Sequence, residues 1–494
     1  MNLLKQFAGQ AVTYGLSTIL SRIIYYLVVV VFLSHVLGSQ TTEFGTFSFF
    51  YAYAAILISL FSFRLDTALF RFGHNKETLD KVFSTVLLPI LLTAFSIIVI
   101  GYFLCEPIAE LINFPDRSRY VTWFAYILAF DVINLIPFAK LRLQNKAKTF
   151  ALFKVFNVVL SSLLILFFLW ILPQHEDGAL SWMPKVQATI DWVFIANLIA
   201  SGVLFFLLLP TMKSLRLQLD FALLKKMLYY SLPLVIVSLA NGLIQFFSTP
   251  LQEMFLDGDH ATNLAQAGVY DLTRRIASLF VMFTTAFNYA AEPFFFNNAT
   301  QENRETLYGK ICRLFTLVGG IIVLGMYLGV DLLKYLIDSN YWESLYLLPV
   351  LLMAYLFLGI YYNISIWYKL SDLTWYGAAI SIVGAVVTLS LSISLLPKIG
   401  YAASAWSTLA SYFIMVVLGY YWGQKKYRIP YPIKSILTDL VLISALLFLA
   451  FLIKSYSSIS VKYLSYLLIF IGFLLYVWTR EKKIWLSAIG KPGS

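Results

Sequence analysis

Residues 266–292 read QAGVYDLTRRIASLFVMFTTAFNYAAE, a stretch long enough to cross a bilayer as one helix. Its first half carries three charged residues, Asp271, Arg274 and Arg275, in otherwise apolar or weakly polar surroundings. A guanidinium at the bilayer centre costs at least about 2.5–3.5 kcal/mol even on lenient scales of membrane insertion. Two adjacent arginines at this depth therefore indicate that the helix faces a polar cavity, an acidic partner or an anionic ligand.

The rest of the chain repeats this span-length pattern. Of its 494 residues, 60% are hydrophobic and only 12% are charged, too few to cover a soluble protein of this size. We therefore predict an all-α polytopic membrane protein with fourteen transmembrane helices. The predicted spans are roughly 10–36, 42–63, 82–105, 119–139, 149–172, 188–210, 227–249, 266–292, 311–330, 345–366, 373–396, 400–422, 435–453 and 461–479.

Lysine and arginine follow every second predicted span, as the positive-inside rule requires of cytoplasmic loops. The densest groups lie at 64–81, 140–148, 213–226 and 425–434. This pattern predicts that both termini are cytoplasmic. Basic loops beside an anionic inner leaflet also explain the formal net charge of +11, so we expect membrane lipids and no nucleic acid as partners.

Two of the predicted helices begin alike and indicate an internal repeat. Phe44-Gly45 opens the second span and Ala267-Gly268 opens the eighth, at a spacing of about 223 residues. A six-helix unit returns to the side where it began, so two copies would be parallel and related by an axis along the membrane normal. We predict an N-lobe at 1–220, a C-lobe at 221–424, and two further helices with a tail at 425–494.

A third arginine, Arg22, lies inside the first predicted span. At 1.5 Å per residue it is roughly 18 Å from the cytoplasmic end, and Arg274 is roughly 12 Å from the outer end. In a core of about 30 Å these depths nearly coincide, so Arg22 and Arg274 or Arg275 are predicted to bind one anionic ligand. Asp271 is spaced to pair with either neighbouring arginine, and the cavity set is these four residues.

Other charged residues have two open interpretations. Asp131 is a lone carboxylate midway along the fourth span, either a counter-ion to Arg22 or a protonatable coupling residue. Arg64, Asp66 and Arg71 end the second span, where they either anchor the helix or form a cytoplasmic gate. Glu292 occupies the equivalent end of the eighth span and is predicted to be a gate partner. If all the buried charges only pair with one another, they are structural.

Motifs for catalysis and metal binding are absent from the sequence. The four histidines have no metal-ligand spacing, and no phosphate-binding loop or catalytic triad signature occurs. We expect no enzyme activity, no metal site and no cofactor, although a coupling cation, H⁺ or Na⁺, is compatible with the predicted transport sites.

Four short segments resemble bacterial polysaccharide-biosynthesis flippases. They are TALFRF at 67–72, NYAAEPFFF at 288–296, IWYKLSD at 366–372 and GYAASAWST at 400–408. Together with the fourteen-span layout, they are similar to the Wzx-type exporters of the multidrug/oligosaccharidyl-lipid/polysaccharide (MOP) superfamily.

The resemblance implies two six-helix lobes in a V shape, a cationic central cavity, and two extra helices packed outside. It implies that undecaprenyl-diphosphate-linked oligosaccharide moves from the inner to the outer leaflet of the bacterial cytoplasmic membrane, for lipopolysaccharide or other polysaccharide synthesis, beside a polysaccharide polymerase. Arg22 and Arg274 or Arg275 match the family's cavity arginines. One departure is that the eleventh span lacks the interior carboxylate that some relatives use for sodium, which leaves the coupling ion open.

Two other functions remain open. One is a multidrug or small-cation exporter of the same superfamily, which the buried arginines and the extra pair of helices disfavour. The other is a membrane-embedded glycan polymerase or ligase. Such an enzyme needs a large outer loop for its catalytic residues, and no predicted loop is large enough.

Overall fold

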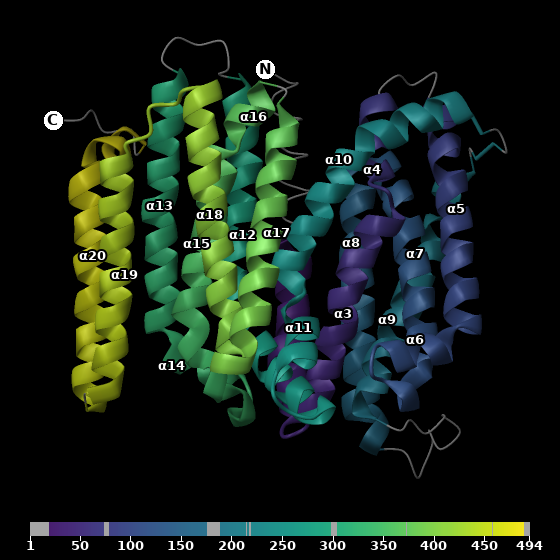
Figure 1. The fold of residues 1–494 in the computed structure, drawn as a ribbon, viewed down its shortest axis with the longest axis horizontal. Helices are drawn as coiled ribbons and strands as arrows, with labels where there is room; N and C mark the ends of the chain where they lie inside the picture. The colour runs from purple at the N-terminus through teal and green to yellow at the C-terminus, as the bar shows by residue number, and fades with distance from the viewer. Residues whose placement is uncertain are drawn as a thin grey trace. The chain divides into compact units, whose positions relative to one another are not determined.

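The computed structural model describes residues 19–73, 79–174, 188–213, 215–216, 219–297, 304–371, 373–456 and 458–488. These residues form helices joined by short connections, with no strand among them (Figure 1). Thirteen helical segments of the described chain are long and apolar enough to cross a membrane. The long helix α12 (His260–Asn297), with charged residues in its first half, is the remaining member of the fourteen that the sequence predicts.

The first six predicted spans are all present as helices. The first comprises residues 19–26, the π-helical η1 (Leu27–Phe32) and α2 (Leu33–Leu37), and π-helical segments are often found at functional sites. The others are α3 (Thr41–Phe61) with α4 (Leu65–Phe72), α5 (Leu79–Phe103) with the short α6 (Cys105–Leu111), α7 (Ser118–Leu143), α8 (Ala147–Leu166) and α9 (Thr189–Leu208).

The remaining spans follow the predicted order. They are α10 (Phe221–Phe246) with α11 (Ser248–Phe255), α12, α13 (Arg304–Leu328) with α14 (Val330–Leu333), α15 (Leu348–Ile364) with α16 (Ile366–Leu370), α17 (Thr374–Ile399), α18 (Ala402–Lys426), α19 (Ile433–Tyr456) and α20 (Ile459–Ala488).

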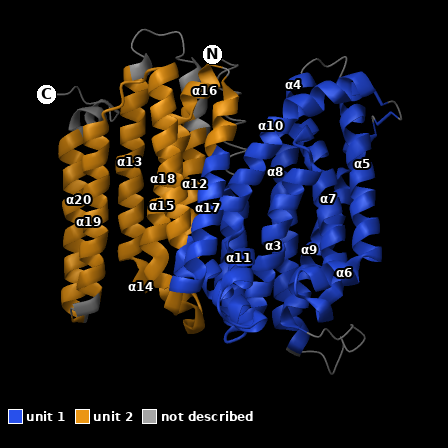
Figure 2. Cartoon of the chain, in the orientation of Figure 1, with its two compact units in different colours: residues 1–272, 381–404 blue, residues 273–380, 405–494 orange. Residues whose placement is uncertain are grey.

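The chain forms two compact units (Figure 2). Unit 1 contains residues 1–272 and 381–404, and unit 2 contains residues 273–380 and 405–494. The helices α12, α17 and α18 therefore each contribute residues to both units. The predicted lobe boundaries at 220 and 424 stay a prediction.

Within unit 1, the start of α12 crosses the start of α3 at two glycines. A Cβ atom on Gly45 would overlap the carbonyl group of Leu264, and one on Gly268 would overlap the carbonyl oxygen of Thr41. Only glycine allows the two backbones to approach this closely. The glycines that mark the predicted repeat in the sequence thus form a physical contact between its two copies.

The second span is broken near the end that we predict to be cytoplasmic. Phe63 and Arg64 have φ angles of 48° and 52°, in the left-handed region that bulky side chains rarely adopt. This double kink ends α3 and sends the chain into α4. Because the chain changes direction between α3 and α4, the side chains of α4 can line a cavity that a straight continuation of α3 would not reach.

Within unit 2, the last two helices pack against α13 through a buried carboxylate. Asp439 on α19 accepts a 3.3 Å hydrogen bond from Nε of Arg313 on α13 and a 2.6 Å hydrogen bond from the hydroxyl of Tyr476 on α20. The Asp439 side chain is fully buried, so both partners are needed to offset its desolvation. In Figure 1 α19 and α20 lie side by side.

Candidate functional site

A cavity of about 410 Å³ lies among five helices of unit 1. Its lining mixes charged, amide and aromatic side chains from α3, α4, α7, α8 and α9. The lining residues are Ile58, Asp66, Phe70, Asp131, Asn134, Leu135, Phe138, Ala139, Arg142, Phe150, Lys154, Asn157, Val158 and Leu204. A charged cavity among apolar spans is costly to maintain, which makes it the candidate functional site.

The acidic side of this cavity is set by α7 and α4. Asp131, on α7, accepts a 2.8 Å hydrogen bond from the hydroxyl of Ser201 on α9. Asp66, on α4, accepts a 3.4 Å hydrogen bond from the neighbouring Thr67 hydroxyl. The break after α3 is what allows Asp66 to share a cavity with Asp131.

The basic side of the cavity has two lining cations and a third cation nearby. Lys154 on α8 and Arg142 at the end of α7 both line the cavity, and Arg22 in the first helix lies within electrostatic reach of Lys154. Arg142 lies over the ring of Phe70 at 4.8 Å, and Lys154 lies over the ring of Phe150 at 5.5 Å. These contacts position the cations, and negative charge, from the cavity's own carboxylates or from a bound anion, reduces the repulsion among them.

Three oxygen atoms of the cavity residues are buried and accept no hydrogen bond within the described part of the chain. They are Oδ1 of Asp66, Oδ1 of Asn134 and Oδ1 of Asn157. Buried polar atoms are nearly always hydrogen-bonded, so these acceptors suit a ligand that donates, such as a hydroxyl group or water. The cavity therefore combines cations with unfilled acceptors.

The structure places Asp66 and Asp131, which the sequence singled out separately, in one cavity, and Arg22 lies within electrostatic reach of Lys154 in the same cavity. Arg22 was predicted to bind substrate, Asp131 to act as a counter-ion or coupling residue, and Asp66 to form a gate. Sequence analysis missed Lys154, although the signal was present: a lysine in the second turn of an otherwise apolar span, FALFKVFNVV at 150–159. It also counted Arg142 only as a loop cation.

The arginines of α12 belong to unit 2, whereas Asp271 belongs to unit 1. Asp271 is fully buried and accepts a 2.6 Å hydrogen bond from the Ser48 hydroxyl on α3, a partner that the sequence did not reveal. Arg274 and Arg275 are both half-buried. Their convergence with Arg22 on one ligand, and the pairing of Asp271 with either, stay predictions.

The predicted gate residues Arg64 and Arg71 have different surroundings. Arg64 stands at the strained start of α4, and its Nε is buried without a hydrogen-bond partner in the described residues. Arg71 lies over the ring of Tyr230 on α10, at 4.5 Å. The side chain of Glu292 lies outside the part of the chain that the structure describes, so its gating role stays a prediction.

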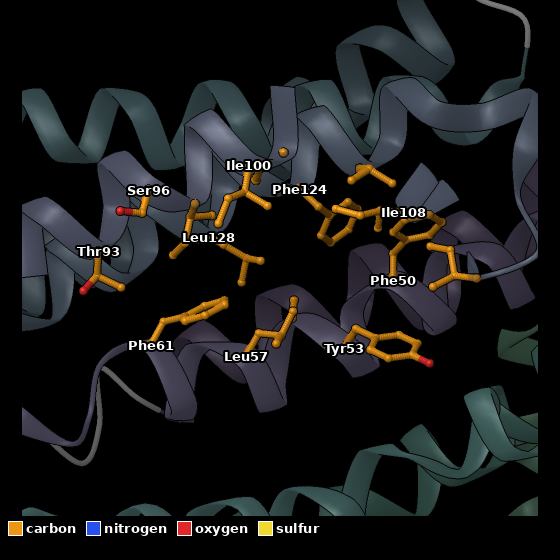
Figure 3. A pocket seen from close by; sticks show the side chains of 16 residues that line it. Phe50, Tyr53, Leu57, Phe61, Thr93, Ser96, Ile100, Ile108, Phe124 and Leu128 are labelled. Carbon is orange, nitrogen blue, oxygen red and sulfur yellow. The ribbon is translucent and has the colours of Figure 1, made fainter. Parts of the chain in front are cut away.

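A second cavity in unit 1, of about 260 Å³, has a different chemistry (Figure 3). Side chains from α3, α5, α6 and α7 surround it, including Phe50, Leu57, Ile100, Ile108 and Phe124. Nearly all of its lining is apolar, and an apolar cavity of this size excludes water and accepts hydrocarbon. A charged cargo would therefore occupy the cavity of Asp131 and Lys154 in preference to this one.

Solved structures with the same architecture are transporters and flippases. One is described as the lipid II flippase MurJ in an inward closed conformation, with a TM-score of 0.71, 15% identity, and coverage of 95% of this chain and 99% of that chain. Another is an inward-facing multidrug resistance MATE family transporter of the MOP superfamily, with a TM-score of 0.64, 15% identity, and coverage of 82% and 94%.

A third structure is that of the MATE multidrug transporter DinF-BH, with a TM-score of 0.58, 15% identity, and coverage of 86% and 96%. No protein-family model matches the chain, and no curated protein matches its sequence. The chain has the fold of the MOP exporters. It is a multi-span membrane protein, and the likeness extends over nearly the whole length of these structures.

Proposed function

We propose that this MOP-fold protein is a flippase for a lipid-linked oligosaccharide that carries a diphosphate. The observation that supports it most directly is that Arg142 and Lys154 line one cavity among the membrane-spanning helices, with Arg22 within electrostatic reach of Lys154. The cargo class is undecaprenyl-diphosphate-linked glycan, moved from the inner to the outer leaflet of the bacterial cytoplasmic membrane. The likeness to a structure described as a lipid II flippase supports the same class.

A diphosphate fits the electrostatics of the basic side. It carries two or more negative charges, which offset the mutual repulsion of the three cations without requiring a conformational change. Arginine binds phosphate oxygens with two parallel charge-assisted hydrogen bonds, whereas lysine contributes a point charge. Each such contact is worth about 1.5–3 kcal/mol, a 10- to 150-fold effect on affinity.

The sugar part of the cargo fits the remaining lining. Hydroxyl groups donate to the buried acceptors of Asp66, Asn134 and Asn157, and apolar lining residues such as Leu135 and Val158 contact the carbon skeleton of the sugar. In this scheme Arg274 or Arg275 completes the diphosphate site when the two halves of the protein rock. Asp131 resets the carrier by binding a coupling cation.

A multidrug or small-cation exporter is the second candidate. The observation that favours it is the presence of two carboxylates, Asp66 and Asp131, in the same cavity, since carboxylates attract organic cations. Structures of multidrug MATE transporters share the fold. The two functions predict opposite charges for the cargo, so one experiment separates them.

Transport in reconstituted liposomes tests the proposal. Liposomes containing the purified protein receive a fluorescent lipid-linked oligosaccharide with a diphosphate, and an impermeant lectin reports the fraction in each leaflet. We expect the wild type to redistribute the lipid and Lys154→Gln to slow it by about 10-fold or more. Lys148→Gln, an exposed lysine six residues earlier on the same helix, is the matched control and should transport normally. Equal rates in all three proteins would overturn the proposal.

A further inference from the structure

A third cavity in unit 1, of about 460 Å³, opens at the ends of α7, α8 and α9 that we predict to face the cytoplasm. It shares no lining residue with the candidate transport site. Its lining is basic, polar and in part apolar. The residues are Lys140, Leu141, Gln144, Lys146, Thr149, Phe153, Leu207, Pro210, Thr211 and Lys213.

Two tight turns position the lysines of this cavity. Between α7 and α8, Asn145 adopts a φ of 57°, which asparagine tolerates better than most residues. The backbone N–H of Lys146 then donates to the carbonyl oxygen of Leu141 at 2.9 Å, which fixes where its side chain begins. After α9, Pro210 is the second residue of the short 3-10 helix η5 (Leu209–Met212), and Lys213 follows this helix directly.

The three lysines differ in their surroundings. Lys140 is almost fully buried, with its Nζ 3.3 Å from Oδ1 of Asp80 and 3.3 Å from the carbonyl oxygen of Thr211. Lys146 and Lys213 are exposed, and no carboxylate is among the lining residues. Asp80 offsets one charge, so the cavity retains a net positive charge of about two.

The flank of this cavity is apolar and exposed. On α9, Phe206 is 64% exposed and Leu207, which lines the cavity, is 38% exposed. On α8, Leu152 is 65% exposed. These side chains belong to predicted membrane spans, so their exposed faces contact lipid chains. A cationic pocket beside a lipid-facing apolar flank is complementary to an amphiphile with an anionic headgroup and apolar chains.

From this arrangement we infer that the cavity binds the headgroup of an anionic phospholipid of the surrounding bilayer. The phosphodiester lies between Lys146 and Lys213, where Gln144, Thr149 and Thr211 supply further polar groups. The acyl chains lie along Phe206 and Leu207. Basic pockets between transmembrane helices on the cytoplasmic side are suited to anionic headgroups, and this occupant would fix α7, α8 and α9 relative to one another.

The apolar flank distinguishes a lipid from a free phosphate. A soluble anion would gain only from the lysines and the polar side chains and would be released readily, because salt screens exposed charges. A lipid also loses no apolar contact with the bilayer when its chains remain on α8 and α9. The occupant is therefore a lipid of the bilayer and not a soluble anion, and its cavity shares no lining residue with the proposed transport site.

Lipid binding to the purified full-length protein tests the inference. Native mass spectrometry would measure binding of phosphatidylglycerol against phosphatidylcholine with identical chains. We expect wild type to prefer phosphatidylglycerol, and Lys146→Gln/Lys213→Gln to lose about 25-fold in that preference, near fivefold per lysine. The matched control is Lys225→Gln/Lys226→Gln, which removes two exposed lysines of α10 outside the cavity. It should retain the wild-type preference.

Each other outcome counts against the inference. Equal loss in the control pair would mean that the preference reflects overall charge and not this cavity. An unchanged preference for phosphatidylglycerol in Lys146→Gln/Lys213→Gln would show that this cavity does not bind the lipid. Competition by millimolar glycerol phosphate as strong as by the lipid would assign the cavity to soluble phosphates. The melting temperature of each variant, expected to match wild type without lipid, confirms that these exposed substitutions leave the fold intact.

Discussion

Ser48 on α3 donates a 2.6 Å hydrogen bond to Asp271 on α12, across a separation of 223 residues. Gly45 and Gly268, which face each other at the same helix crossing, are separated by the same number. Equivalent positions of the two predicted repeats therefore meet each other at one point of unit 1. Such self-contact of equivalent residues is expected where a pseudo-twofold axis passes between two copies.

The Ser48–Asp271 bond should contribute measurably to stability. Asp271 is fully buried, and a hydrogen bond to a charged group is worth about 1.5–3 kcal/mol. We expect Ser48→Ala to lower the melting temperature in detergent, and Ser48→Thr, which keeps the hydroxyl, to lower it less. A melting temperature of Ser48→Ala equal to that of wild type would show that other contacts of Asp271 suffice.

The glycine crossing should not tolerate a methyl group. Because a Cβ on Gly45 or Gly268 would overlap backbone atoms of the facing helix, Gly45→Ala and Gly268→Ala should each destabilise the protein by about 3 kcal/mol, the upper end of typical overpacking effects. Gly472→Ala on α20 is the control, since nothing lies within 4 Å of its Cβ position. It should be neutral or stabilising by about 0.5–1 kcal/mol. Folded yield by size-exclusion fluorescence measures all three, and normal yield of Gly45→Ala would refute the close crossing.

Sequence analysis predicted the helices well and the contacts poorly, for a physical reason. Apolar length decides whether a segment spans the membrane, so the predicted spans were readable from the chain alone. The cavity depends on the break at Phe63 and Arg64 and on the rotation of α8, which hydropathy does not encode. Lys154 was overlooked for that reason, and the sequence could not show that Asp66 and Asp131 line the same cavity.

Asp331 makes the stability of unit 2 pH-dependent. Its carboxylate is buried, 2.8 Å from Nζ of Lys462, 3.7 Å from Nζ of Lys334 and 3.8 Å from Nζ of Lys454. Burial alone raises the pKa of Asp331, but the close contact with Lys462 and the charges of the lysines outweigh it and hold the pKa below the ordinary 3.8.

This lowered pKa sets the direction of the effect. A carboxylate that is more acidic in the folded state stabilises the fold above its unfolded pKa and loses that contribution as the pH falls through the folded pKa. Asp331→Asn should therefore lower the melting temperature at pH 7, by the equivalent of about 1–3 kcal/mol, and the difference from wild type should shrink below pH 3.8. Asp257→Asn, at an exposed carboxylate, is the control. A difference that is constant from pH 7 to pH 3 would contradict the role of the charge.

Asp131 is predicted to carry the coupling cation. It lines the charged cavity and is oriented by the Ser201 hydroxyl at 2.8 Å. Asp131→Asn removes its charge at similar volume, so it should weaken transport and abolish the response to an imposed proton or sodium gradient. Ser201→Ala should weaken transport and keep the gradient response. Liposome flux with and without each gradient measures both effects. A full gradient response in Asp131→Asn would show that Asp131 does not carry the coupling cation.

The charge of the cargo tests the proposed function most directly. Equilibrium binding of a short-chain isoprenyl diphosphate and of a cationic dye should be measured side by side on wild type, Lys154→Gln and Lys148→Gln. We expect wild type to bind the diphosphate in preference to the dye, Lys154→Gln to lose about 10- to 150-fold in diphosphate affinity, and Lys148→Gln to be unchanged. Preference of the wild type for the dye, with diphosphate affinity insensitive to Lys154, would contradict the flippase and favour a cation exporter.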